Sequence, residues 1–119
     1  MEHIRGIGKL KKYSESLTLS QFRILRRLVL EHEGLSATVY CKLCTDHFDP
    51  PLAIDLKFDG VKSFKTQELG GGQSTIDGFD VIDISSKGWE RINWQAMDYE
   101  DGLVHWYAEE FEILDVAPL

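Results

Sequence analysis

The feature that most constrains the fold is a two-residue alternation of apolar and polar side chains in the middle of the chain. Over residues 54–59, apolar side chains alternate with charged ones, and Asp59-Gly60 then signals a turn. A second alternation covers residues 37–43 and ends before Pro50-Pro51, which cannot continue a paired strand. Because successive side chains of a strand point to opposite faces, both runs predict half-buried strands.

The last third of the chain contains the strongest hairpin signal, Tyr99-Glu100-Asp101-Gly102. Asp-Gly is strongly preferred in tight hairpin turns, so we expect Trp89 to Asp98 to pair with Leu103 to Leu114. A further apolar run, Phe79 to Ile84, precedes this hairpin and predicts another strand.

The register of the hairpin depends on the length of its loop. A two-residue loop places Asp98 opposite His105, and a four-residue loop places Trp94 opposite Tyr107. Either pairing leaves a large aromatic side chain on each face. We therefore expect one face to pack in the core and the other to lie near solvent or against a second layer.

The segment from Ser16 to Gly34 is compatible with two structures. Thr18 followed by Gln21 has the pattern of a capping box, which indicates a helix. The consecutive apolar residues 28–30 suit either a buried helix or a buried strand. We favour a strand from about Leu25 onward.

Taken together, these segments predict one domain over residues 1–119 that is mainly β. A chain of this length can bury a core without disulfide or metal support. We expect an antiparallel sheet, or a two-layer sandwich of about six to eight short strands. This arrangement has at most one short helix, near residues 16–28, and an α+β arrangement is the alternative.

The composition favours a cytoplasmic protein without a membrane partner. No apolar run approaches the roughly 20 residues that a membrane-spanning helix needs. The first residues lack the apolar region of a secretory signal. Only two cysteines occur, fewer than a disulfide-stabilised secreted domain normally carries.

Charge is distributed unevenly along the chain. The net charge is −7, yet residues 1–30 carry seven bases and two acids, a net of +5. Between Asp77 and Asp115 there are eleven acidic residues, two basic ones (Lys87 and Arg91) and all three tryptophans. An acidic, aromatic-rich segment suits a basic protein partner and disfavours nucleic acid.

Cys41-Lys42-Leu43-Cys44 and His47 form half of a zinc-binding pattern. Cys41, Cys44 and His47 would supply three ligands, with His32 or His105 as the fourth. Residues three apart on a strand point to opposite faces, so a shared metal would require a bend at Leu43. Because no second CxxC or HxxxH pattern is present, we favour two packed thiols and expect no metal and no cofactor.

His105 and Asp98 are the only candidate acid–base pair of the predicted hairpin. With Trp106, they would mark a cleft if the protein bound a small molecule or were an enzyme. No nucleophile or oxyanion donor accompanies them, so we expect a cross-strand polar pair and no catalytic residue.

The chain also resembles a family of small bacterial proteins. The resemblance covers Leu52 to Val61 with Phe64, then Ile76 to Ile84, the Gly88-Trp89 turn, and a final aromatic strand ending at Phe111 to Ile113. This pattern is similar to the immunity-protein-50-like group associated with polymorphic toxin systems. The resemblance implies a non-enzymatic, β-rich protein that neutralises a cognate toxin by direct binding.

On this hypothesis, the acidic third of the chain would contact a basic toxin domain. Charge complementarity would speed association, and aromatic anchors would slow dissociation. A homo-oligomeric structural module that uses its exposed aromatic side chains is a further alternative. The expected binding residues are the aromatic Trp94, Tyr99, Trp106 and Tyr107 and the acidic Asp98, Glu100, Asp101, Glu109 and Glu110.

Overall fold

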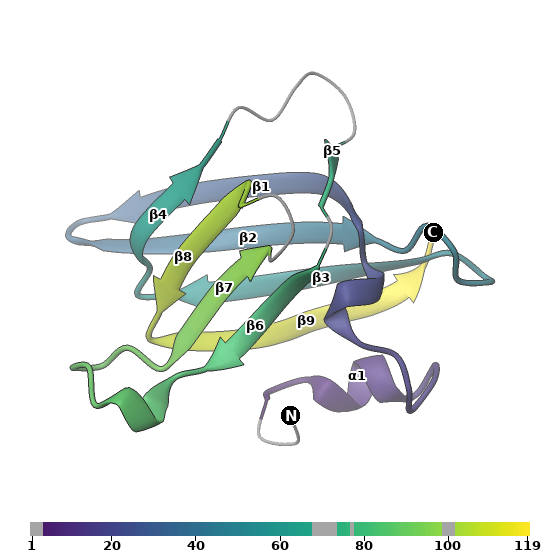
Figure 1. Ribbon diagram of the computed structural model, residues 1–119, viewed down its shortest axis with the longest axis horizontal. Helices are drawn as coiled ribbons and strands as arrows, with labels where there is room; N and C mark the ends of the chain where they lie inside the picture. Colours follow the sequence, from purple (N-terminus) through teal and green to yellow (C-terminus); the bar gives the residue numbers. More distant parts are fainter. Residues whose placement is uncertain (1–3, 68–73, 77, 99–101) are drawn as a thin grey trace.

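In the computed structural model, which describes residues 4–67, 74–76, 78–98 and 102–119, the chain forms two stacked antiparallel sheets (Figure 1). The five-stranded sheet has the order β5-β1-β2-β3-β9, with bounds Ser74–Thr75, Ile24–Glu33, Ser36–Cys44, Leu52–Asp59 and Glu110–Pro118. The four-stranded sheet has the order β4-β8-β7-β6, with bounds Lys62–Thr66, Val104–Ala108, Trp94–Asp98 and Phe79–Asp83. The predicted mainly β fold is confirmed.

The two alternating segments of the sequence become the adjacent strands β2 and β3. Cys41 lies opposite Leu56 and Leu43 lies opposite Ile54, and all four side chains are buried. The polar side chains between them point to the other face of the sheet. The period-two pattern therefore predicted both the strands and the face that enters the core.

The segment that was compatible with helix or strand is a strand, as favoured. Its β1 begins at Ile24, after a single 3₁₀ turn, η1, over Leu19–Gln21. The capping box is present, and the Gln21 side chain accepts a hydrogen bond from the Thr18 N–H at 2.8 Å. It caps this one turn only. The α-helix, α1, lies earlier, at Ile7–Lys11.

Both predicted registers of the C-terminal hairpin are wrong by one residue. Strands β7 and β8 pair Ala96 with Trp106 and Met97 with His105. A shift of one residue moves side chains to the opposite face of a strand. As a result, Asp98 and Trp106 point inward while His105 points outward.

The predicted strand from Leu103 to Leu114 is also wrong, because the chain changes sheets at Glu109. Strand β8 ends at Ala108 in the four-stranded sheet, and β9 starts at Glu110 in the five-stranded sheet. At this corner the Glu109 N–H donates a hydrogen bond to the Asp59 carbonyl oxygen at 3.0 Å. The strand expected from Trp89 likewise begins only at Trp94, after the 3₁₀ turn η2 (Ser85–Lys87) and a loop.

Trp106 is fully buried at the centre of the core between the sheets. Its ring is edge-on to Phe58 of β3, with 5.1 Å between centroids. Phe64 and Phe79 lie within 5.5 Å and 6.2 Å of the same ring. Phe58 in turn stacks on Phe111 at 4.7 Å, so one aromatic cluster joins the two layers.

Among the described residues, no helix has the length and apolar composition needed to span a membrane.

Candidate functional site

The structure describes six of the nine residues proposed for partner binding, and these six do not share one surface. Trp106 is fully buried and Asp98 is 2% exposed, because both lie on the inner face of the hairpin. Asp98 Oδ1 accepts a hydrogen bond from the Val104 N–H at 2.8 Å. These two side chains therefore belong to the core, which corrects their assignment to a binding surface. Tyr99, Glu100 and Asp101 lie outside the described residues.

Tyr107 lies on the outer face of the four-stranded sheet, opposite to the face of Trp106. Its ring is edge-on to Trp89 and His105, with centroid distances of 5.3 Å and 4.8 Å. Trp94 is on the inner face of the same sheet, where its ring is edge-on to Phe111 at 5.5 Å. Tyr107 and Trp94 therefore do not share a surface.

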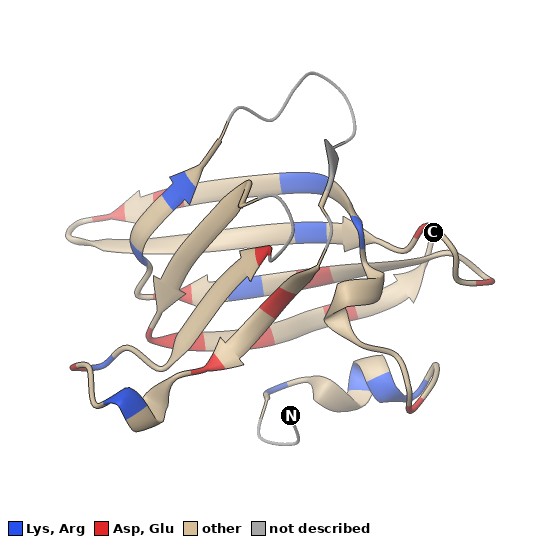
Figure 2. Ribbon diagram, viewed as in Figure 1, with Lys and Arg blue, Asp and Glu red and all other residues tan. Residues whose placement is uncertain are grey.

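Three of the predicted residues converge on one cleft, which has a volume of about 290 Å³ and lies where β6 and β7 meet the start of β9. We call it the acidic cleft. Figure 2 shows acidic but no basic residues on β6 and β9. Basic but no acidic residues lie on α1, β2 and β4, and strands β1 and β3 carry both signs. The cleft is lined by Arg5, Asp83, Ser85, Asn93, Trp94, Glu109, Glu110 and Phe111.

Local hydrogen bonds hold the polar lining of the cleft in place. Asp83 Oδ1 accepts hydrogen bonds from the Ser85 N–H at 2.9 Å and the Ser85 hydroxyl at 2.6 Å. The Asn93 side chain donates to the Glu109 carbonyl oxygen at 2.9 Å. Because these bonds form within the turn after β6 and at the β8–β9 corner, the Asp83 carboxylate and the Glu109 backbone are positioned before any partner binds.

Two arginines from other segments already pair with the glutamates. Arg91 Nε lies 3.1 Å from Glu109 Oε1, and Arg5 Nη2 lies 3.3 Å from Glu110 Oε2. Both arginine side chains are mostly exposed, at 78% and 65%. Exposed ion pairs stabilise a protein by only about 0–1 kcal/mol. A cationic side chain from another molecule can therefore replace either arginine at small cost.

The zinc alternative lacks converging ligands. Cys41 points into the core, where burial and the nearby Asp55 raise the pKa of its thiol to about 12. Burial also raises the pKa of Cys44, which lies on the opposite face of β2. The His47 side chain is 83% exposed, with Nε2 3.4 Å from Asp46. Across the described residues, no three His, Cys, Asp or Glu side chains are grouped closely enough to hold a metal ion.

The cleft considered for a small-molecule or enzymatic function, with His105, Asp98 and Trp106, is not formed. His105 lies on the face of β8 opposite to Trp106 and forms a hydrogen bond of 2.9 Å with the Gln95 side chain. Burial and the neighbouring Lys65 lower the pKa of His105. A cross-strand polar contact does exist, but its partner is Gln95 rather than Asp98.

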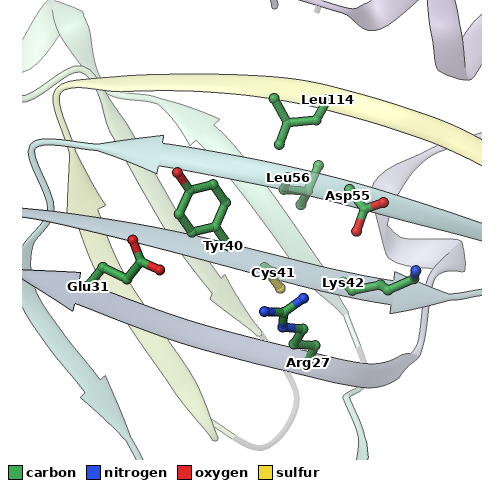
Figure 3. Close-up of a pocket in the computed structure, with 8 residues that line it drawn as sticks. All are labelled: Arg27, Glu31, Tyr40, Cys41, Lys42, Asp55, Leu56 and Leu114. Atoms are coloured by element: carbon green, nitrogen blue, oxygen red, sulfur yellow. The ribbon is translucent and has the colours of Figure 1, made fainter.

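The outer face of the five-stranded sheet carries a second depression, of about 330 Å³. In Figure 3 the side chains of Tyr40, Lys42 and Asp55 stand on this face, while Cys41 and Leu56 point away from it. Oppositely charged side chains line it, so it does not favour one sign of ligand charge. The remaining lining residues are Arg27, Glu31 and Leu114.

Sequence patterns missed five of the eight residues that line the acidic cleft. Asp83 and Arg5 are separated from Glu110 by 27 and 105 positions, and only the tertiary fold brings the three together. Asp83 lies inside the apolar run Phe79 to Ile84, and that run gave no signal of a functional residue. Nothing in the sequence pairs Arg5 with β9.

Comparison with protein-family models, curated proteins and solved structures finds no match to this chain. The resemblance to the immunity-protein-50-like group therefore rests on the residues that carry it.

Proposed function

We propose that the protein is a non-enzymatic binding protein that holds a basic segment of a protein partner in the acidic cleft. The observation that carries this proposal is the convergence of Trp94, Glu109 and Glu110 with Asp83 around one opening. These residues come from three different strands and one corner. Their grouping combines an aromatic ring with carboxylates, which is a favourable environment for an arginine or lysine side chain.

The charge balance of the cleft supports a cationic ligand. Three carboxylates line it against a single lining cation, Arg5. A partner cation would exchange with Arg5 or Arg91 and form charge-assisted hydrogen bonds to the same oxygens. The half-buried Trp94 ring would cover the aliphatic part of that side chain and limit its contact with water.

The resemblance to immunity proteins suggests a toxin as the partner. Toxins that act on nucleic acid present basic, phosphate-seeking surfaces, and an acidic cleft is complementary to such a surface. On this proposal the protein works in the cytoplasm of a bacterium and blocks a toxin by occupying its basic site.

Reversal of one cleft charge tests the proposal. The partner to try first is the product of the neighbouring gene, recovered by co-purification. Glu110→Lys should lower the association rate roughly threefold to tenfold at low salt and much less at high salt, because electrostatic steering is screened by ions. Glu15→Lys is the matched control, since it makes the same charge change at an exposed residue that does not line the cleft.

Two outcomes would contradict the proposal. One is an equal loss of association rate in Glu110→Lys and Glu15→Lys, which would indicate a general charge effect. The other is failure to recover the neighbouring gene product or any other protein partner. Circular dichroism of both variants controls for unfolding after loss of the Arg5 ion pair.

A further inference from the structure

Among the described residues, strand β1 has an open edge along most of its length. It pairs with β2 from Ile24 to Glu33 on one side, but on the other side it pairs with β5 only at Ile24 and Leu25. From Arg27 onward, no described strand lies on that second side. Figure 1 shows β1 as the outermost long strand of its sheet. Such an edge presents unpaired backbone N–H and C=O groups and can accept another strand.

The opposite edge of the same sheet is covered by the N-terminal segment. The Ile113 N–H of β9 donates a hydrogen bond to the Arg5 carbonyl oxygen at 2.9 Å. The Lys9 ammonium group donates to the Leu114 carbonyl oxygen at 2.8 Å. Contact between η1 and β6 likewise covers part of an edge of the four-stranded sheet. The long edge of β1 has no comparable cover among the described residues.

The charges along β1 are arranged so that the strand complements itself in the antiparallel direction. Arg27 lies near its start, whereas Glu31 and Glu33 lie near its end, and all three point to the outer face. An antiparallel copy centred on Val29 places Arg27 opposite Glu31. One centred on Leu30 places Arg27 opposite Glu33. A parallel copy places like charges opposite each other, which is destabilising.

These three charges are available for such pairing. In the described part of the chain, no salt bridge includes Arg27, Glu31 or Glu33, whereas Arg5, Lys57 and Arg91 each pair with a carboxylate. Arg27, Glu31 and Glu33 are all exposed.

The apolar side chains of β1 also lack cover at the edge. Leu28 and Leu30 pack against the core but are only partly buried, although their β2 partners Cys41 and Val39 are buried. Val29, on the outer face, is partly buried as well. A neighbouring strand would remove more of this surface from water, which favours association.

We infer that β1 pairs with β1 of a second copy in the antiparallel direction and forms a symmetric dimer with one continuous sheet. A twofold axis at Val29 or Leu30 makes both Arg–Glu contacts equivalent, as a closed dimer requires. This interface is independent of the acidic cleft, which lies toward the β9 edge, so the cleft stays accessible in the dimer.

Charge exchange on β1 tests the dimer. Sedimentation equilibrium of the wild-type chain should give twice the monomer mass of 13.6 kDa. Arg27→Glu alone, or Glu31→Arg with Glu33→Arg, should weaken the dimer about tenfold, because each change places like charges opposite each other. An equimolar mixture of these two variants should restore the dimer as a heterodimer, since opposite charges then face each other.

Lys87→Glu is the control, because it reverses an exposed charge in η2, away from the edge, and should leave the wild-type dimer intact. Circular dichroism establishes whether each variant is folded. If Arg27→Glu does not fold, the variant with Glu31→Arg and Glu33→Arg still tests the interface by itself. A wild-type chain that stays monomeric at its solubility limit would overturn the inference. So would a dimer that both variants leave unchanged, because that dimer would use another surface.

Discussion

His105, on the outer face of the four-stranded sheet, makes the stability of the protein depend on pH. Its Nε2 atom forms a hydrogen bond of 2.9 Å with the Gln95 side chain, and its ring forms a T-shaped pair with Tyr107 at 4.8 Å between centroids. Partial burial lowers the pKa of His105 from its ordinary value of 6.5, and the nearby Lys65 lowers it further. Both effects disfavour the charged imidazolium in the folded state.

We expect the free energy of unfolding to fall as the pH drops below 6.5. The unfolded chain then binds a proton at His105 more readily than the folded chain, so protonation favours unfolding. The stabilisation is fully present above the ordinary pKa and is lost as the pH falls through the lowered folded value. Urea denaturation at several pH values measures this slope.

The variant His105→Gln should show a smaller pH slope than wild type, because it removes the titrating group. His47→Gln is the matched control, since its side chain is 83% exposed and lies outside the sheet. Equal slopes in wild type and His105→Gln would contradict the assignment.

At the scale of elements, the N-terminal segment depends on one glycine. Gly6 has a φ of +82°, a left-handed conformation that disfavours residues with a side chain. A Cβ at this position would collide with the Ile113 carbonyl oxygen of β9. Gly6 therefore allows the segment before α1 to lie directly against the edge strand and to carry Arg5 to Glu110.

We expect Gly6→Ala to lower the free energy of unfolding by about 1–2 kcal/mol, from backbone strain and the collision with β9. Hydrogen exchange should also become faster at the Ile113 amide, which donates to the Arg5 carbonyl oxygen. Gly8→Ala is the control, because Gly8 is in α1 with nothing within 4 Å of an added Cβ. It should be neutral or slightly stabilising. Equal changes in the free energy of unfolding and in Ile113 exchange for both variants would show that close packing at Gly6 does not hold the N-terminal segment against β9.

The elements also show the limit of prediction from local patterns. The alternation over residues 37–43 and 54–59 correctly predicted β2 and β3, because each pattern is complete within its own strand. The hairpin after Trp94 was correct in kind but not in register. Loop length sets the register. The two-residue loop predicted Asp98 and His105 on one face, whereas the observed register, shifted by one residue, puts them on opposite faces.

At the scale of the whole molecule, aromatic contacts join the two sheets into one core. Phe58 of β3 contacts Trp106 of β8 edge-on and stacks on Phe111 of β9. All three side chains are buried, at 4% exposure or less. Because the contacts cross between layers, neither sheet retains its buried face if the other unfolds.

We expect the protein to unfold in one cooperative transition and Phe58→Ala to destabilise it by about 3–5 kcal/mol through loss of buried surface and creation of a cavity. Far-UV circular dichroism and tryptophan fluorescence should give coincident midpoints in wild type and variant. Phe58→Leu, which keeps most of the buried volume, should cost clearly less. Separate midpoints for the two probes would indicate that the sheets unfold independently.

The tertiary structure also divides the acidic third of the chain into residues that line the cleft and residues that are buried. Of the nine binding residues expected from sequence, Trp94, Glu109 and Glu110 meet at one cleft. Trp106 and Asp98 are buried instead. Composition identified a segment rich in acids and aromatics, but it carried no information on which of them face inward.

The sequence by itself determined that the protein is mainly β, where β2, β3 and β6 lie, and which side chains of β2 and β3 are buried. These properties follow from the two-residue period of a strand, which is a local effect. Only the tertiary structure decided the hairpin register, the change of sheet at Glu109, the meeting of Arg5 with Glu110 and the open edge of β1. Each of these depends on contacts between segments far apart in the chain, where a shift of one residue reverses the outcome.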